Sequence, residues 1–164
     1  MPQLNNSHKV VRALMGGWQL ATIYYRMTGN PLTITTGVDR AFTGIENQRP
    51  DENKSYAEPY AKNRSVDVWL NSKAFTTPER GKLGNLGVGT ALGPERNWTL
   101  NVALMKRFQV FEGHRLEVRA EAFNVLNHPM PANPDTNLNS STFGRIVSAG
   151  GDPRILQLAL KYNF

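Results

Sequence analysis

The last eleven residues, Arg154-Ile-Leu-Gln-Leu-Ala-Leu-Lys-Tyr-Asn-Phe164, decide the fold class. Leucine and aromatic side chains occupy every second position of this stretch, and Gln, Ala, Lys and Asn stand between them. Successive side chains of a β-strand point to opposite faces, so this alternation predicts a strand over 154–164. One face of the strand is apolar and the other is polar.

Two stretches further upstream repeat the alternation. In 98–108, Trp98 opens a run in which apolar side chains alternate with Thr, Asn and Ala. In 115–126, charged residues at every second position alternate with small apolar ones. A helix is the competing interpretation of 115–126, but its charges would recur at three and four positions. The short Gly-containing link 110–114 between the two runs predicts a β-hairpin.

The N-terminal region shows a less regular pattern. Residues 17–36 are rich in β-branched and aromatic side chains and contain Gly29-Asn30-Pro31. These features predict one strand with a bulge or kink at the Gly-Asn-Pro sequence. Residues 9–15 are a candidate for the end of another strand, with Gly16-Gly17 as a turn.

Composition narrows the class of protein. The 164 residues suit one folding unit, and 14 Gly with 10 Pro indicate many turns. The absence of cysteine excludes disulfides and thiolate metal sites. No apolar run reaches roughly 18 residues, so no transmembrane helix is predicted, whereas a barrel strand needs only about ten alternating residues. The sequence therefore predicts an all-β fold.

Chemistry-bearing motifs are absent from the sequence. The net charge of +6 is dispersed along the chain, and no nucleic-acid reading motif accompanies it. His8, His114 and His128 lack metal-ligand spacing. Gly81, Gly84, Gly87 and Gly89 lack the Lys-Ser/Thr of a phosphate loop and are better explained by tight turns. We expect no enzyme activity, no catalytic residue, no metal, no cofactor and no nucleic-acid partner.

Connection lengths indicate where these strands lie. Residues 37–96 and 127–153 are long and rich in Gly, Pro and Asn, whereas 16–17 and 110–114 are short. Bacterial transmembrane barrels combine long extracellular loops with short periplasmic turns. With a periplasmic C-terminus, every connection falls on the side that its length predicts. We therefore expect antiparallel strands of an outer-membrane β-barrel in a Gram-negative type of cell. The strands contact outer-membrane lipid, and residues 37–96 and 127–153 form long extracellular loops.

Two sets of side chains follow from this arrangement. Aromatic residues expected at the membrane interfaces are Trp18, Trp98, Phe108 and Phe111. Charged residues expected to face the lumen are Arg115, Glu117, Arg119 and Glu121, with a solvated face carrying cross-strand ion pairs as the open alternative. About five crossings are fewer than the eight of the smallest bacterial barrels, so we expect the natural polypeptide to continue N-terminally.

Several segments resemble one family. They are Gly93-Pro-Glu-Arg-Asn-Trp98, Lys106-Arg-Phe108, Leu116-Glu-Val-Arg-Ala-Glu-Ala-Phe-Asn-Val-Leu-Asn-His-Pro129, Phe143-Gly-Arg-Ile146 and the final Gln157–Phe164. With these segments and Gly17-Trp-Gln-Leu20, the chain resembles the C-terminal barrel part of TonB-dependent outer-membrane receptors that carry a carboxypeptidase-regulatory-like domain, the Oar-like proteins. The resemblance covers residues 1–164 apart from a variable region at 38–65.

The resemblance implies a large barrel with an internal plug, nutrient uptake of an unknown small molecule, and energy from the TonB system through N-terminal parts that these residues lack. It also implies that Tyr162 and Phe164 form a signal for the barrel-assembly machinery; packing in a core is the simpler alternative. A soluble or surface all-β binding or adhesion module is the competing function, and it requires the apolar faces to pack on a second sheet.

Overall fold

The computed structural model describes residues 15–56, 58–95 and 98–164, which form two compact units. One unit, here called the sheet unit, comprises 15–26, 98–128 and 152–164. The other, here called the loop unit, comprises 27–56, 58–95 and 129–151. Among the described residues, no helix is long and apolar enough to cross a membrane.

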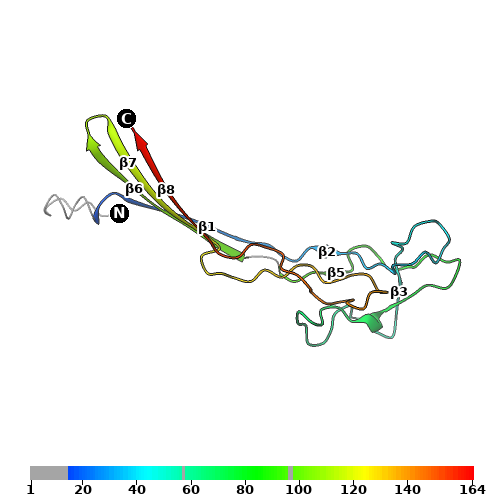
Figure 1. Cartoon of the computed structure of the whole chain (residues 1–164). Coiled ribbons are helices and arrows are strands. Elements are labelled where there is room, and N and C mark those ends of the chain that lie inside the picture. Colours follow the sequence, from blue (N-terminus) through cyan, green and yellow to red (C-terminus); the bar gives the residue numbers. More distant parts are fainter. Residues whose placement is uncertain (1–14, 57, 96–97) are drawn as a thin grey trace. The chain divides into compact units, whose positions relative to one another are not determined.

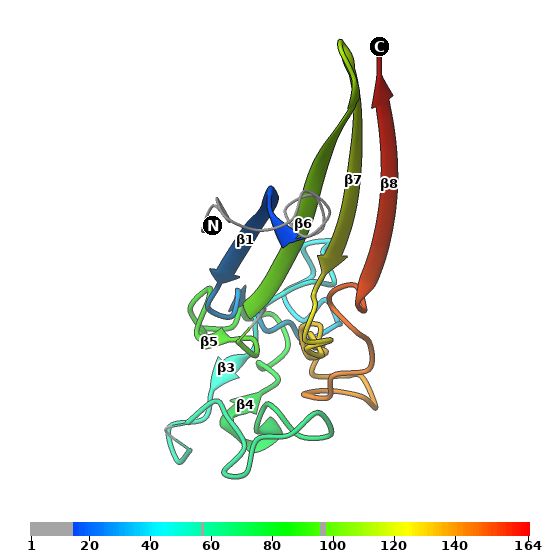
Figure 2. The same ribbon diagram turned by 90° about the vertical axis from the view of Figure 1, so that its left-hand side faces the viewer.

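The sheet unit is one antiparallel sheet of four strands in the order β1-β6-β7-β8 (Figure 2). The strands are β1 (Trp18–Arg26), β6 (Trp98–Phe111), β7 (His114–Phe123) and β8 (Ile155–Asn163). Their lengths of 9 to 14 residues suit strands that cross a bilayer. The predicted all-β, antiparallel fold class is confirmed. Within these four strands the sheet stays open, because β1 and β8 stand at its two edges.

A two-residue turn joins β6 to β7. Phe111 pairs with His114, so only Glu112 and Gly113 lie in the turn, and Gly113 adopts a φ of 79° that favours glycine. The pairing shifts between Gln109 and Phe111, which marks a bulge just before the turn. The predicted hairpin is confirmed, although β6 runs three residues further than expected. The C-terminus lies beside this turn (Figure 1).

The N-terminal strand prediction is wrong in its second half. Instead of one kinked strand over 17–36, β1 ends at Arg26, and residues 27–36 belong to the loop unit. Gly29 packs so closely on the carbonyl of Gly93 that a Cβ would clash there. Leu32 then pairs with Ala91, in β2 (Pro31–Leu32) and β5 (Ala91–Leu92). The Gly-Asn-Pro sequence therefore terminates the strand. The candidate strand 9–15 lies almost wholly outside the described residues.

The other strand boundaries need smaller corrections. β7 starts at His114 and ends at Phe123 instead of spanning 115–126, because Asn124 takes a left-handed φ of 49° that breaks the strand. The helical alternative for this segment is wrong. β8 covers 155–163, within the predicted 154–164.

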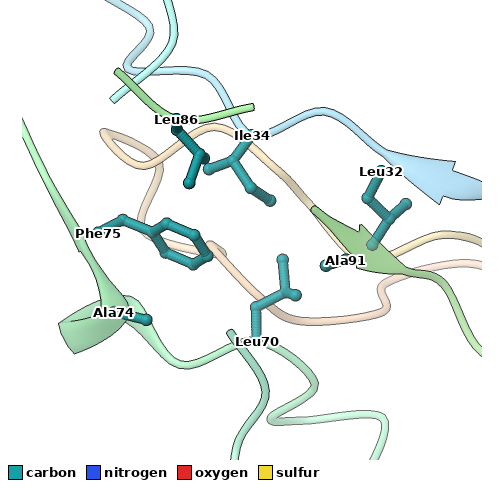
Figure 3. Packing of buried hydrophobic residues seen from close by; sticks show 7 residues of the cluster. All are labelled: Leu32, Ile34, Leu70, Ala74, Phe75, Leu86 and Ala91. Atoms are coloured by element: carbon teal, nitrogen blue, oxygen red, sulfur yellow. The ribbon is translucent and has the colours of Figure 1, made fainter. Parts of the chain in front are cut away.

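The loop unit has a hydrophobic core of its own. Its short elements are β2 and β5, the pair β3 (Asp51–Glu52) and β4 (Phe75–Thr76), and the 3-10 turn η1 (Ser72–Ala74). Seven buried apolar side chains converge in it (Figure 3): Leu32, Ile34, Leu70, Ala74, Phe75, Leu86 and Ala91. The predicted long connections are therefore not unstructured.

Backbone pairing inside the loop unit ties the connection between β1 and β6 to the connection between β7 and β8. Thr35 bridges to Asn137, and the amide of Trp69 donates to the carbonyl of Gly144 at 2.7 Å. The ring of Phe143 also lies edge-on to that of Phe75, with centroids 6.0 Å apart. Phe143 thus lies in the connection that the sequence predicts over 127–153.

Candidate functional site

The register of the sheet places the side chains on two contrasting faces. Directly paired residues of an antiparallel sheet lie on the same face, and the pairs Leu104 with Ala120 and Ala120 with Leu158 define the first one. This apolar face carries the following residues: Trp18, Leu20, Thr22, Tyr24, Arg26, Trp98, Leu100, Val102, Leu104, Lys106, Phe108, Phe111, His114, Leu116, Val118, Ala120, Ala122, Leu156, Leu158, Leu160 and Tyr162. Three of four strands contribute almost only apolar groups to it.

The apolar face is uncovered in the part of the chain that the structure describes. Leu156, Leu158 and Leu160 of β8 are 71%, 83% and 71% exposed. Buried hydrophobic side chains of the chain gather instead in the loop unit. A continuous exposed apolar face of this kind marks a surface that contacts lipid or another protein. It is the opposite of the two-layer core that the soluble-module alternative requires.

The other face, here called the polar face, carries the charged ladder. Arg115, Glu117, Arg119 and Glu121 all lie on it, with alternating sign along β7. Glu117 pairs directly with Arg107 on one side and Lys161 on the other, and its Oε2 accepts from the Arg107 Nε at 2.6 Å. The four residues thus share one face with cross-strand ion pairing. Whether this face lines a lumen stays a prediction.

Aromatic side chains gather at the turn end of the apolar face. Trp18 and Phe108 flank the ammonium of Lys106, which lies 4.8 Å and 5.1 Å from the two ring centroids. The hydroxyl of Tyr162 lies 2.8 Å from the Nδ1 of His114, whose ring contacts Phe111 edge-on. Trp18, Lys106, His114 and Tyr162 each have an apolar body and a polar tip, which suits a membrane–water interface.

A second aromatic group lies at the opposite end of the sheet. Trp98 stacks on His128 with centroids 4.1 Å apart and contacts Tyr24 at 6.5 Å. Between Trp98 and Phe108 the strand runs about 33 Å, which at a tilt of about 40° spans about 25 Å, the height of the apolar band of a membrane barrel. The predicted interfacial residues Trp18, Phe108 and Phe111 therefore lie at one end and Trp98 at the other.

Sequence reasoning missed part of both aromatic groups. Tyr24, His114 and His128 belong to them, and Lys106 is a buried cation on the apolar face. The even-numbered positions of the alternating runs contained this information, since Tyr24 and His114 fall in phase with Trp18 and Phe108. Phe164, predicted to belong to the assembly signal, is 93% exposed in this chain and its ring lies beside that of Tyr162.

Asn124 joins three strand ends at the Trp98 end, a role that sequence reasoning also missed. Its backbone amide donates to the Asn101 Oδ1 at 2.9 Å. Its buried side chain donates from Nδ2 to the carbonyls of His128 and Asp152, at 3.1 and 3.2 Å, and its Oδ1 accepts from the His128 amide at 2.9 Å. The sequence offered one indication of this role: Asn124 directly follows an alternating run, and Asn tolerates the left-handed backbone that ends a strand.

Two carboxylates of the loop unit are stabilised in their charged form. Desolvation acts to raise the pKa of Asp39, but hydrogen bonds from the amides of Thr43 and Gly44 and from Gln48 outweigh it, so the pKa is lowered. Desolvation also opposes the change at Asp135, where Ser140, Thr142 and the Asn137 amide lower the pKa. Both carboxylates hold turns in place.

Comparison with protein families shows which kind of protein contains this sheet. The family model described as "Outer membrane beta barrel domain" matches residues 1–157. The chain belongs to this outer-membrane β-barrel family. No curated protein and no solved structure matches it. Membership places this barrel protein in the outer membrane and agrees with the uncovered apolar face.

The remaining site predictions stay predictions for this outer-membrane barrel protein. Within the described residues, no group of three or more His, Asp or Glu side chains is placed to hold a metal ion. The expectations that the protein is no enzyme, needs no cofactor and has no nucleic-acid partner are not tested by this finding. Recognition of Tyr162 and Phe164 by the assembly machinery is likewise untested.

Proposed function

We propose that the chain is part of the barrel wall of a TonB-dependent receptor that takes up a nutrient across the outer membrane. The observation that carries the proposal is the four-stranded sheet with an uncovered apolar face and two edge strands, β1 and β8. Unpaired strand edges are not tolerated in the hydrocarbon region, so further strands must close this sheet. Four described strands are half of the smallest bacterial barrel, and a receptor barrel is far larger.

The loop unit supports a receptor role over that of a simple pore. Two long connections, from different strand pairs, share one hydrophobic core and are joined by backbone pairing. Long structured loops carry recognition in many proteins because a rigid scaffold positions them. In our proposal the loop unit faces the outside of the cell and contacts the nutrient, while the plug and the TonB-contacting segment come from other parts of the polypeptide.

A comparison of deletion strains tests this function. The gene that encodes the full-length polypeptide and the TonB gene are deleted singly and together, and growth of these three strains and of the parent strain is followed on a panel of sole carbon, nitrogen and iron sources. We expect at least one nutrient on which both single deletions grow slowly and the double deletion grows no more slowly. Normal growth on every nutrient of the strain that lacks only the full-length polypeptide, together with loss of surface attachment, would instead support the adhesion module.

A further inference from the structure

The loop unit contains a surface pocket of about 360 Å³, a volume in the range of small-molecule sites. Segments from both long connections line it, so the pocket exists only when they fold together. Asp39, Arg40, Phe42 and Arg80 line it from the first connection, and Leu138 and Asn139 line it from the second.

Two arginines meet at this pocket because two turns are fastened to each other. The amide of Arg40 donates to the Gln48 Oε1 at 2.8 Å, and the carbonyl of Arg40 accepts from the Gly81 amide at 2.8 Å. These bonds hold the backbone of Arg40 beside the turn that carries Arg80. Among the described residues neither guanidinium is in an ion pair, and the Nε of Arg40 is buried without a hydrogen-bond partner.

The neighbouring carboxylates are already engaged elsewhere. Asp39 accepts hydrogen bonds from the amides of Thr43 and Gly44, at 3.1 and 2.6 Å, and from the Gln48 side chain. Glu79 pairs with Lys82 at 2.7 Å. Within the described residues, neither acid forms an ion pair with Arg40 or Arg80, and two arginines against the single carboxylate of Asp39 leave the pocket lining with an excess of positive charge.

An exposed aromatic ring completes the lining. Phe42 is 67% exposed and has a φ of 57°, a left-handed conformation that is unfavourable for a bulky residue. Its ring lies 5.7 Å from the guanidinium carbon of Arg80. Residues with strained backbone cluster at functional sites, and a guanidinium is attracted to the face of an aromatic ring.

We propose that this pocket binds a small organic anion, with a carboxylate or phosphate group on the guanidinium groups of Arg40 and Arg80 and an apolar body against Phe42. Guanidinium suits this task because its fork of donors matches a planar or tetrahedral oxyanion. The pocket gives the proposed receptor a ligand class, and its physiological role rests on the proposed receptor function. Anion binding itself can be measured without transport.

An NMR titration of the whole chain in detergent micelles tests the site. Benzoate is the probe, and benzamide is the neutral control of the same shape. We expect benzoate to shift the amide signals of the pocket residues with a dissociation constant on the order of 1 mM, and benzamide to bind at least tenfold more weakly. Arg40→Gln should weaken benzoate binding at least tenfold and Arg80→Gln by a smaller factor. Lys54→Gln, which removes an equal charge outside the pocket, should leave it unchanged.

The indole signal of Trp69 reports whether each variant stays folded, since its Nε1 donates to the Leu92 carbonyl at 3.0 Å inside the loop unit. If Arg40→Gln unfolds this unit, the benzoate and benzamide comparison on the unsubstituted chain decides. Equal binding of the two probes, no binding of benzoate, or equal weakening by Lys54→Gln would overturn the proposal. If the full-length polypeptide supports TonB-dependent uptake but the pocket does not bind benzoate, the pocket proposal is wrong and the proposed receptor function stands.

Discussion

Single residues set the limits of the strands. Asn124 ends β7 because its left-handed backbone and its hydrogen bonds bring the ends of β6, β7 and β8 together. Gly29 ends β1 in a different way, through its close approach to the Gly93 carbonyl. Strand ends in this protein are therefore fixed by tertiary contacts of one residue, which period-two patterns do not reveal.

Asn124→Ala should destabilise the sheet unit strongly. The substitution leaves the His128 amide and two carbonyls without partners and places alanine in left-handed backbone, at a combined cost of about 2–4 kcal/mol. Urea titration of the full-length polypeptide in lipid vesicles measures this loss. Asn163→Ala, at the exposed end of β8, is the control and should cost less than about 0.5 kcal/mol. Equal effects of both changes would show that the Asn124 network is not stabilising.

The carboxylates of the loop unit predict its acid sensitivity. The pKa values of Asp39 and Asp135 are lowered in the folded state relative to an unfolded value near 3.9. Their stabilisation is therefore present above about pH 4 and is lost as pH falls through the folded pKa values. The Trp69 indole signal of the chain in micelles should weaken below about pH 4, and Asp135→Asn should make this change less steep. A signal that is constant down to pH 2 would contradict the assignment.

At the scale of elements, the alternating runs predicted β6, β7 and β8 closely. In the described part of the chain no second protein layer packs on these strands, so whether a side chain is apolar or polar depends only on which face its position points to. The loop unit was less predictable. Ile34, Leu70, Phe75 and Leu86 form its core from separated segments with no common period, and only the folded chain brings them together. The pocket with Arg40 and Arg80 was missed for the same reason.

Arginine substitutions on adjacent residues of β6 test the difference between the faces. Val102 lies on the apolar face, whereas Ala103 pairs with Glu121 on the polar one. Val102→Arg should destabilise the barrel in lipid by about 2–4 kcal/mol, as expected for a lipid-facing charge near mid-membrane. Ala103→Arg should change stability by less than about 1 kcal/mol. Heat-dependent mobility on gels after urea titration measures both, and the reverse order would contradict the assignment of the faces.

At the scale of the whole molecule, the sheet unit is a segment of a wall and the loop unit is a small structure with its own core. The sheet unit depends on lipid for its apolar face and on further strands for its two edges. The loop unit buries its apolar groups within itself. This division explains why one chain combines exposed leucines with a conventional core.

The apolar face of the sheet unit touches lipid. Because residues 1–164 contain no cysteine, single cysteines at 156 to 161 can carry spin labels in an otherwise cysteine-free full-length polypeptide in bilayers. We predict that labels at 156, 158 and 160 are relaxed by oxygen and protected from a water-soluble nickel chelate, while labels at 157, 159 and 161 show the reverse. Equal protection of all six positions from both reagents would place β8 in a closed protein core and contradict the account.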